Sequence, residues 1–129
     1  MHKAISQSIL ELFNNCMPKD EPHHVSIMFF EPIIQILNNN DEVKQIGASI
    51  VLKALIEHIG KKKNLSFIID NLFTNIIDAI IKTTSESPEL FELFSKLIKN
   101  VKISCIIENI NKILKKINSI LKSGINLLV

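Results

Sequence analysis

Residues 29–60 carry the pattern that most constrains the fold of this chain: two runs of helical periodicity joined by a short polar turn. Apolar residues recur at intervals of three and four on both sides of Asn38-Asn39-Asn40-Asp41, which is the spacing of amphipathic helices. Asp is a preferred N-cap residue, so we expect Asp41 to begin the second helix. Gly60 stands where a glycine commonly ends one. The segment therefore predicts a helical hairpin, with helices over residues 25–37 and 42–59.

The same periodicity predicts four further helices, over residues 3–16, 65–83, 89–100 and 103–122. Ser87 is a suitable N-cap for the helix that follows it, and Pro88 suits the first helical position. Pro32 lies inside a predicted helix and should bend it. Residues 17–24 contain two prolines and are expected to form a linker. Gly124 is expected to end the last helix.

The apolar positions of three helices predict which side chains form the core. In the helix over residues 42–59 we expect the inward set to be Val43, Ile46, Ile50, Val51, Ala54 and Leu55. Its small residues Gly47 and Ala48 should let a neighbouring helix approach closely. The helix over residues 65–83 has an apolar face wide enough for contacts on two sides: Leu65, Ile68, Ile69, Leu72, Phe73, Ile76, Ile77 and Ile80. The last helix carries a regular isoleucine stripe: Ile103, Ile106, Ile110, Ile113, Ile117 and Ile120.

Composition places the chain in the all-α class. Its 129 residues suit a single domain over residues 1–129, and 47% hydrophobic residues can bury a core. There is no Trp or Tyr, and only three Gly, so an all-β or loop-rich fold is not expected.

The net charge is only +2 and every basic side chain is Lys, which argues against nucleic-acid binding. Cys16 and Cys105 match no metal or redox spacing, and we expect reduced, buried thiols.

The sequence contains no recognisable signal peptide or membrane-spanning segment. Its first residues lack the layout of a signal peptide, and no run approaches the roughly 20 apolar residues of a spanning helix. We therefore expect a cytoplasmic protein, and the resemblance described next extends this expectation to the cytoskeleton.

The hairpin resembles the HEAT-repeat family of helical repeats. In that pattern an Asp-bearing turn leads into a helix that opens with Val, a basic residue and small residues, which here are Asp41, Val43, Lys44, Gly47 and Ala48. Helix pairs starting near residues 25, 65 and 103 give the period of roughly 40 residues expected of HEAT and armadillo repeats. The resemblance implies a right-handed α-solenoid of about three HEAT/ARM-like hairpins.

A narrower resemblance is to the TOG-like array of the Tortifolia/Spiral microtubule-associated proteins. It rests on two segments, Phe30-Glu31-Pro32-Ile33 and the run from Val43 to Leu52. Such arrays bind tubulin through the turns inside each repeat, so the resemblance implies tubulin or microtubules as the partner. The second turn, over residues 83–89, lacks the Asp-Val-basic signature.

The candidate protein-binding residues follow from this pattern: Asn38, Asn39, Asn40, Asp41 and Lys44. The alternative is that Asp41 only caps its helix and that the Asn run is solvated. Lys61-Lys62-Lys63 could contact an acidic partner or serve as a solvated connector. His23 and His24, with Asp20, Glu21 and His58, lack the spacing of a metal site, and we expect no metal.

The function expected from the sequence is a non-catalytic protein-binding scaffold. No nucleophile–base arrangement or phosphate-binding loop is present, so we expect no enzyme, no cofactor and no small-molecule substrate. The alternative is a structural oligomerisation or adaptor module that assembles through the isoleucine stripe of the last helix. The apolar tail Leu127-Leu128-Val129 suggests a fragment of a longer array, because an exposed solenoid end normally carries a polar cap.

Overall fold

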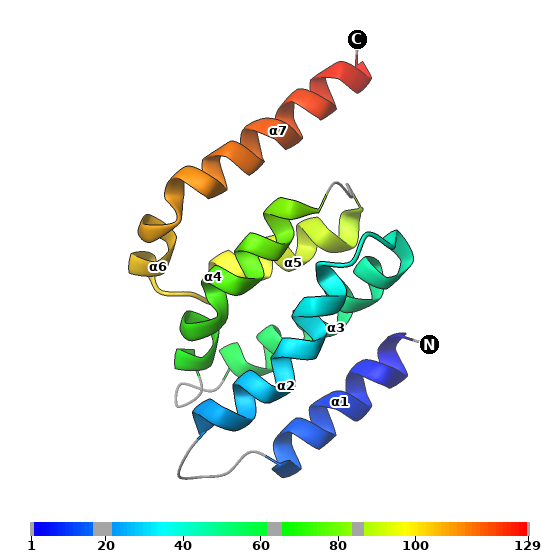
Figure 1. Cartoon of the computed structure of the whole chain (residues 1–129), viewed down its shortest axis with the longest axis vertical. Helices are drawn as coiled ribbons and strands as arrows, with labels where there is room; N and C mark the ends of the chain where they lie inside the picture. Colours follow the sequence, from blue (N-terminus) through cyan, green and yellow to red (C-terminus); the bar gives the residue numbers. More distant parts are fainter. Residues whose placement is uncertain (1, 17–21, 62–65, 84–86, 129) are drawn as a thin grey trace.

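A computed structural model shows that the described chain is all-α (Figure 1). The description covers residues 2–16, 22–61, 66–83 and 87–128, without the side chains of some residues in the outer helices. The helices are α1 (His2–Cys16), α2 (Pro22–Leu37), α3 (Glu42–Gly60), α4 (Ser66–Lys82), α5 (Pro88–Lys99), α6 (Ile103–Glu108) and α7 (Ile110–Leu128). The predicted class is therefore confirmed, and helix α2 begins at Pro22 rather than after the predicted linker.

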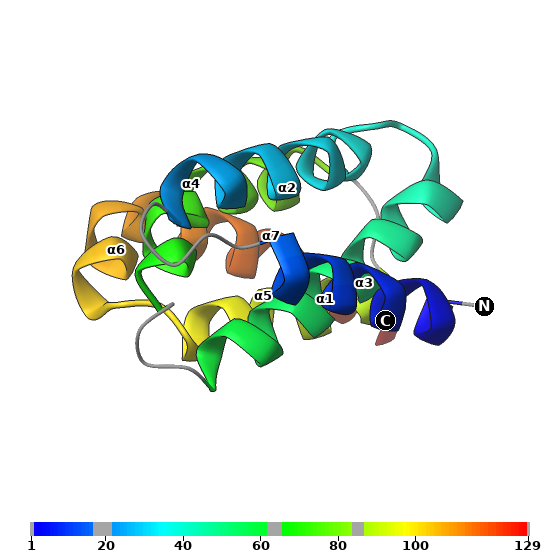
Figure 2. The same cartoon turned by 90° about the horizontal axis from the view of Figure 1, so that it is seen from below.

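The helices form two layers, which Figure 2 shows one above the other. In one, here called layer B, α1 packs on α3 and α3 packs on α5. In the other, layer A, α2 packs on α4, and α4 packs on α6 and α7. Contacts of α2 with α3 and of α4 with α5 join the layers. Along the longest axis, α1 lies at one end and α7 at the other (Figure 1).

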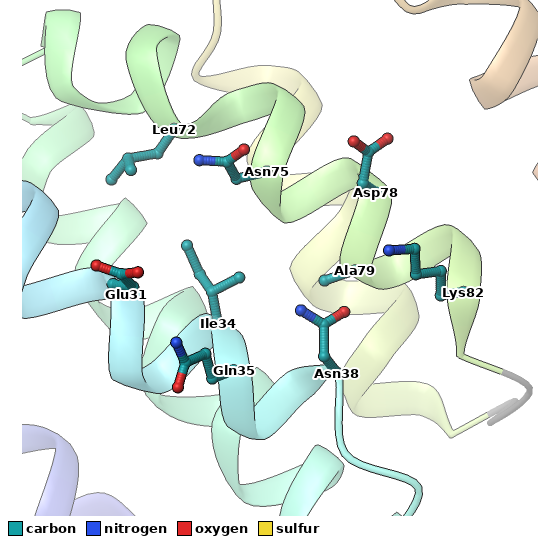
Figure 3. A pocket seen from close by; sticks show the side chains of 9 residues that line it. All are labelled: Glu31, Ile34, Gln35, Asn38, Leu72, Asn75, Asp78, Ala79 and Lys82. Atoms are coloured by element: carbon teal, nitrogen blue, oxygen red, sulfur yellow. The ribbon is translucent and has the colours of Figure 1, made fainter.

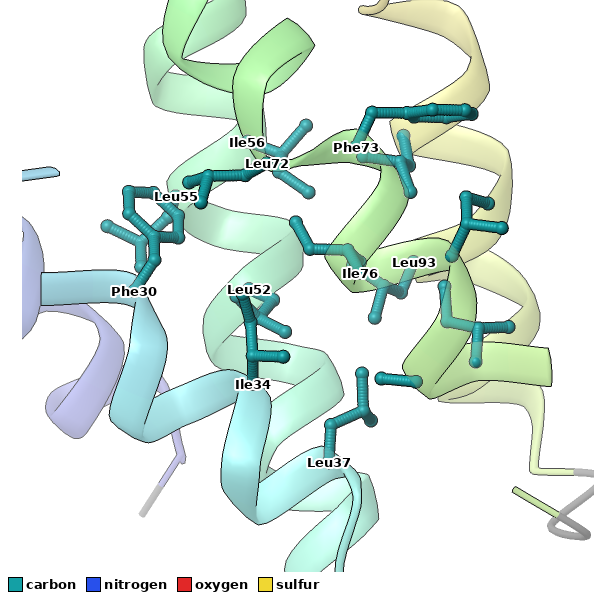
Figure 4. Packing of buried hydrophobic residues seen from close by; sticks show 14 of the residues in the cluster. Phe30, Ile34, Leu37, Leu52, Leu55, Ile56, Leu72, Phe73, Ile76 and Leu93 are labelled. Atoms are coloured by element: carbon teal, nitrogen blue, oxygen red, sulfur yellow. The ribbon is translucent and has the colours of Figure 1, made fainter. Parts of the chain in front are cut away.

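The core lies between the layers (Figure 4). Its largest fully buried side chains come from α2, α3 and α4: Phe30, Leu37, Leu52, Leu55, Ile56, Ile59, Ile68, Phe73, Ile76, Ile77 and Ile80. Each such side chain stabilises the fold by about 1.5–3 kcal/mol relative to leaving it exposed. The apolar face predicted for α4 is confirmed from Ile68 to Ile80, while Leu65 lies outside the described residues. Contacts of α4 with α2, α3, α5 and α7 explain the width of that face.

Helix α3 is central, and its buried residues do not form a single stripe. It contacts α1, α2, α4 and α5, so positions around much of its circumference are covered. Of the predicted inward set, Val51 and Leu55 are buried, whereas Ile46, Ile50 and Ala54 are half-buried. Val43 is 74% exposed, so its predicted inward position is wrong. It lies in the first turn of α3, beyond the reach of the neighbouring helices.

The two glycines predicted to end helices do not act as left-handed caps. Gly60 is the last residue of α3 and its φ is not positive. A Cβ there would run into the side-chain carboxamide of Asn100 at the end of α5, so close approach is the reason for a glycine. Helix α7 passes through Gly124 and ends at Leu128, which contradicts the predicted end.

The predicted last helix is broken into α6 and α7 at Asn109. The backbone of this residue has φ −111° and ψ 12°, and its N–H donates to the carbonyls of Ile106 and Ile107. Its buried carboxamide donates to the Cys105 carbonyl at 3.0 Å and to the Thr74 hydroxyl at 3.4 Å. Asn109 therefore turns the chain and fastens it to α4.

A polar stripe on α4 holds α6 and α7. Asp70, Thr74 and Asp78 are spaced by four residues and so share one face. Asp70 accepts the Lys102 N–H at 2.9 Å, and Asp78 pairs with the Lys112 ammonium at 3.0 Å. With the Asn109 bond to Thr74, these contacts set the position of α7 along α4.

Candidate functional site

The turn between α2 and α3 is built by the side chains of Asn39 and Asp41. Oδ1 of Asp41 accepts the N–H groups of Val43 at 3.0 Å and Lys44 at 3.4 Å, so the predicted N-cap is confirmed. Oδ1 of Asn39 accepts the N–H of Asp41 at 3.1 Å. Two of the five candidate residues therefore shape the turn, in line with the capping alternative.

The other three candidate side chains are available to a partner. Asn38, Asn40 and Lys44 are exposed, as are Asn39 and Asp41. Within the described residues, Asn38, Asn40 and Lys44 form no side-chain hydrogen bond or ion pair. The turn thus presents two carboxamides and one ammonium group to solvent from a backbone fixed by its caps.

Gln45 anchors this turn to the end of α4. It is buried, and its Nε2 donates to the carbonyl of Asn39, while its Oε1 accepts the Thr83 hydroxyl at 3.0 Å. The Ser49 hydroxyl donates to the Gln45 carbonyl at 2.8 Å. The sequence reasoning missed Gln45, although its spacing from Ala48 and Leu52 places it on a buried face of α3.

The second turn starts at the same edge of the molecule. Thr83 follows the last residue of α4, and its carbonyl accepts the Lys116 ammonium of α7 at 3.0 Å. Ser87 caps α5 by accepting the N–H of Leu90 at 3.4 Å, and Pro88 is the first residue of α5, as predicted. Residues 84–86 lie outside the described residues. Gln45 and Thr83 therefore join the turn between α2 and α3 to the C-terminal end of α4.

A hollow of about 390 Å³ lies between α2 and α4 next to this edge (Figure 3). Ile34, Leu72 and Ala79 are its apolar residues. Its polar residues are Glu31, Gln35 and Asn38 from α2 and Asn75, Asp78 and Lys82 from α4. Carboxamides offer both donors and acceptors, so the hollow suits a polar side chain or a short peptide segment better than an apolar ligand.

The remaining candidates do not come together. Lys61 is exposed at the C-terminal end of α3, opposite the turn, while Lys62, Lys63, Asp20 and Glu21 lie outside the described residues, as do the side chains of His23 and His24. Within the described part of the chain, no three potential metal-ligating side chains gather. Burial raises the pKa of the Cys105 thiol, with a smaller contribution from the Asp70 charge, which disfavours the reactive thiolate.

The predicted isoleucine stripe does not form one surface. Ile113 is buried, and Ile106 and Ile117 pack against the core, whereas Ile103 is 73% exposed and Ile110 is also exposed. The side chain of Ile120 is outside the described residues. The break at Asn109 and the docking of α7 on α4 divide the stripe between core and solvent.

Comparison of the chain with protein-family models, curated proteins and solved structures gave no significant match. The resemblance to HEAT and TOG-like repeats therefore stays a prediction. Among the described residues, no helix is both long and apolar enough to cross a membrane.

Proposed function

We propose that this chain is a non-catalytic protein-binding scaffold, built as a short right-handed α-solenoid of HEAT/ARM-like hairpins. The observation that carries the proposal is the Gln45–Thr83 hydrogen bond, which ties the turn between α2 and α3 to the C-terminal end of α4. The exposed groups of Asn38, Asn40 and Lys44 are then presented by a rigid backbone. Rigid presentation lowers the entropic cost of binding, so even a small polar contact surface can be specific.

The two-layer packing supports the solenoid part of the proposal. Helix pairs α2–α3 and α4–α5 stack in the same order in both layers, as consecutive repeats would. The hollow between α2 and α4 adds Gln35, Asn75 and Lys82 to the groups that a partner could contact beside the turn.

Tubulin is the partner that the family resemblance implies, and co-sedimentation with microtubules tests it. Lys44→Glu is the informative variant, because it reverses the charge at the candidate site without endangering the fold. An acidic residue in the first turn of a helix interacts favourably with the helix dipole, so α3 should remain formed. Binding of the original chain that falls at least tenfold in Lys44→Glu would support the proposal.

Lys99→Glu is the matched control. Lys99 is exposed at the end of α5 and forms no ion pair within the described residues, so its charge reversal changes the net charge equally away from the turn. Equal losses in both variants would indicate general electrostatic attraction and not the turn. Absence of binding by the folded original chain would refute tubulin as the partner.

A further inference from the structure

The exposed large apolar side chains gather at the two ends of the molecule. At one end are residues of α1 and α2: Ile5, Leu12 and Ile36. At the other end are residues of α6 and α7: Ile103, Ile107, Ile110, Leu114 and Leu121. Among the described residues, Val43 is the one exposed large apolar side chain that belongs to neither end. Scattered apolar residues need no explanation, but two clustered faces indicate contact surfaces.

The exposed large apolar side chains of α7 share one side of the helix, because Ile110, Leu114 and Leu121 are spaced by four and seven residues. Ile103 and Ile107 are exposed on α6, across the break at Asn109. Ile113 points into the contact with α4, and Lys112 reaches Asp78 from another side of α7. The face is therefore not the one that α4 already covers. We call it the α7 face.

The exposed face of α1 is smaller and surrounds a shallow hollow. Ala4, Ile5, Ser8, Ile9 and Leu12 line this hollow, and every one of them belongs to α1. Helix α1 packs on α3, with Ile9 and Leu10 partly buried against the core. We call this surface the α1 face.

The outermost helices at the two ends of the molecule belong to different layers. Helices α2 and α3 form a pair across the layers, and so do α4 and α5. At one end α1 continues layer B, with α3 as its main neighbour, and at the other end α7 continues layer A on α4. Each end thus carries one helix of an incomplete pair: α1 of layer B at one end and α7 of layer A at the other. Helix α7 of one copy set beside α1 of another would complete a pair and continue both layers.

Charge favours the same arrangement. Glu11 is exposed on α1, and Lys115 and Lys122 are exposed next to Leu114 and Leu121 on α7. None of the three forms an ion pair within the described residues. Joining the α1 face to the α7 face brings opposite charges together. The two lysines outnumber Glu108, the exposed carboxylate at the end of α6, so joining two α7 faces would bring an excess of like charge together, which disfavours a symmetric dimer.

We propose that a second copy of this chain occupies the α7 face with its α1 face, in a head-to-tail contact. This goes beyond the scaffold function, because it uses the ends of the molecule and not the edge that carries the turns. The same contact can repeat at the free ends of each dimer, so association is open-ended unless the rotation between copies closes a ring.

Two double variants test the contact, each adding lysine to one face. Leu114→Lys/Leu121→Lys blocks the α7 face, and Ile5→Lys/Leu12→Lys blocks the α1 face. Sedimentation velocity and light scattering should show that the mass of the original chain rises with concentration above that of the 14.6 kDa monomer. Each double variant alone should stay monomeric. A 1:1 mixture should give a dimer of about twice the monomer mass and nothing larger, since one intact face of each kind remains.

Val43→Lys is the control, because it places the same charge on an exposed apolar site outside both faces and should leave association unchanged. Circular dichroism and urea unfolding establish that each variant is folded before its mass is interpreted. Three results would overturn the proposal: a monomeric original chain at all accessible concentrations, association that survives in the α1-face variant, or a mixture that stays monomeric. The second of these would indicate a symmetric contact through α7.

Discussion

The Thr83 hydroxyl donates a buried hydrogen bond of 3.0 Å to Oε1 of Gln45, which joins the end of α4 to the first turns of α3. The same carboxamide donates through Nε2 to the carbonyl of Asn39 in the preceding turn. One side chain therefore satisfies two polar groups from two different connections. Its loss would remove both hydrogen bonds, of which the one to Thr83 is buried.

We predict that Gln45→Ala lowers the free energy of unfolding by about 1–3 kcal/mol, because it removes two hydrogen bonds that contribute about 0.5–1.5 kcal/mol each. Urea unfolding followed by circular dichroism measures this difference. Gln35→Ala is the control: Gln35 is an exposed carboxamide on α2, and its removal should change the free energy by less than about 0.5 kcal/mol. Equal effects of the two substitutions would contradict the anchoring role of Gln45.

Gly60 and Asn100 should be energetically coupled. A Cβ on Gly60 would displace the Asn100 carboxamide, whose Nδ2 donates to the Lys96 carbonyl at 2.8 Å. Gly→Ala in a helix otherwise stabilises by roughly 0.5–1 kcal/mol. We therefore expect little or no gain from Gly60→Ala in the original chain and a clear gain in an Asn100→Ala background. A double-mutant cycle by urea unfolding should give a coupling of about 1 kcal/mol, and strict additivity would refute the steric explanation.

Much of the fold follows from local patterns in the sequence. Asp41 and Ser87 cap α3 and α5 as predicted, because a cap is a bond between residues two or three positions apart. The apolar face of α4 was predictable because Ile68, Phe73 and Ile76 repeat at helical intervals. Both features depend only on near neighbours in the chain.

The features that were missed depend on contacts between distant segments. Val43 lies at an apolar position of the pattern, but no neighbouring helix reaches it. Asn109 breaks a regular isoleucine stripe because its carboxamide meets Thr74, 35 residues earlier. Gln45 becomes an anchor only through Thr83, 38 residues later. The periodicity of apolar residues does not predict which polar side chains of distant segments meet.

Lys53 should make part of the stability depend on pH. Its ammonium lies 2.9 Å from Oε2 of Glu92, and this hydrogen bond raises the pKa of Lys53 above its ordinary value of 10.5, against a smaller opposing effect of burial. A pKa raised by folding gives a contribution that is complete below the unfolded value and lost as the pH rises through the folded one. The pair is partly exposed, so we expect about 0.2–1 kcal/mol.

The measurement compares the original chain with Lys53→Gln by urea unfolding near neutral pH and again above the raised pKa. The difference in unfolding free energy should be present at the first pH and vanish at the second. Lys99→Gln is the control, because Lys99 forms no ion pair within the described residues and should differ little at either pH. A Lys53 effect that persists at high pH would show that packing, and not the charge, is responsible.

Ile113 is 3% exposed and, with the partly buried Ile117, packs α7 against the core. Ile110, Leu114 and Leu121 of the same helix are exposed. Ile113→Ala should therefore release α7 before the rest of the protein unfolds, since removing a buried Ile costs about 2–5 kcal/mol. Hydrogen exchange is the suitable measurement: amides of α7 should lose protection, while those of α3 and α4 keep most of theirs. Ile110→Ala removes the same atoms from an exposed position one turn away and should leave protection nearly unchanged in dilute solution, where contacts between copies do not enter. If α3 lost protection together with α7, the helix would instead be part of a single cooperative unit.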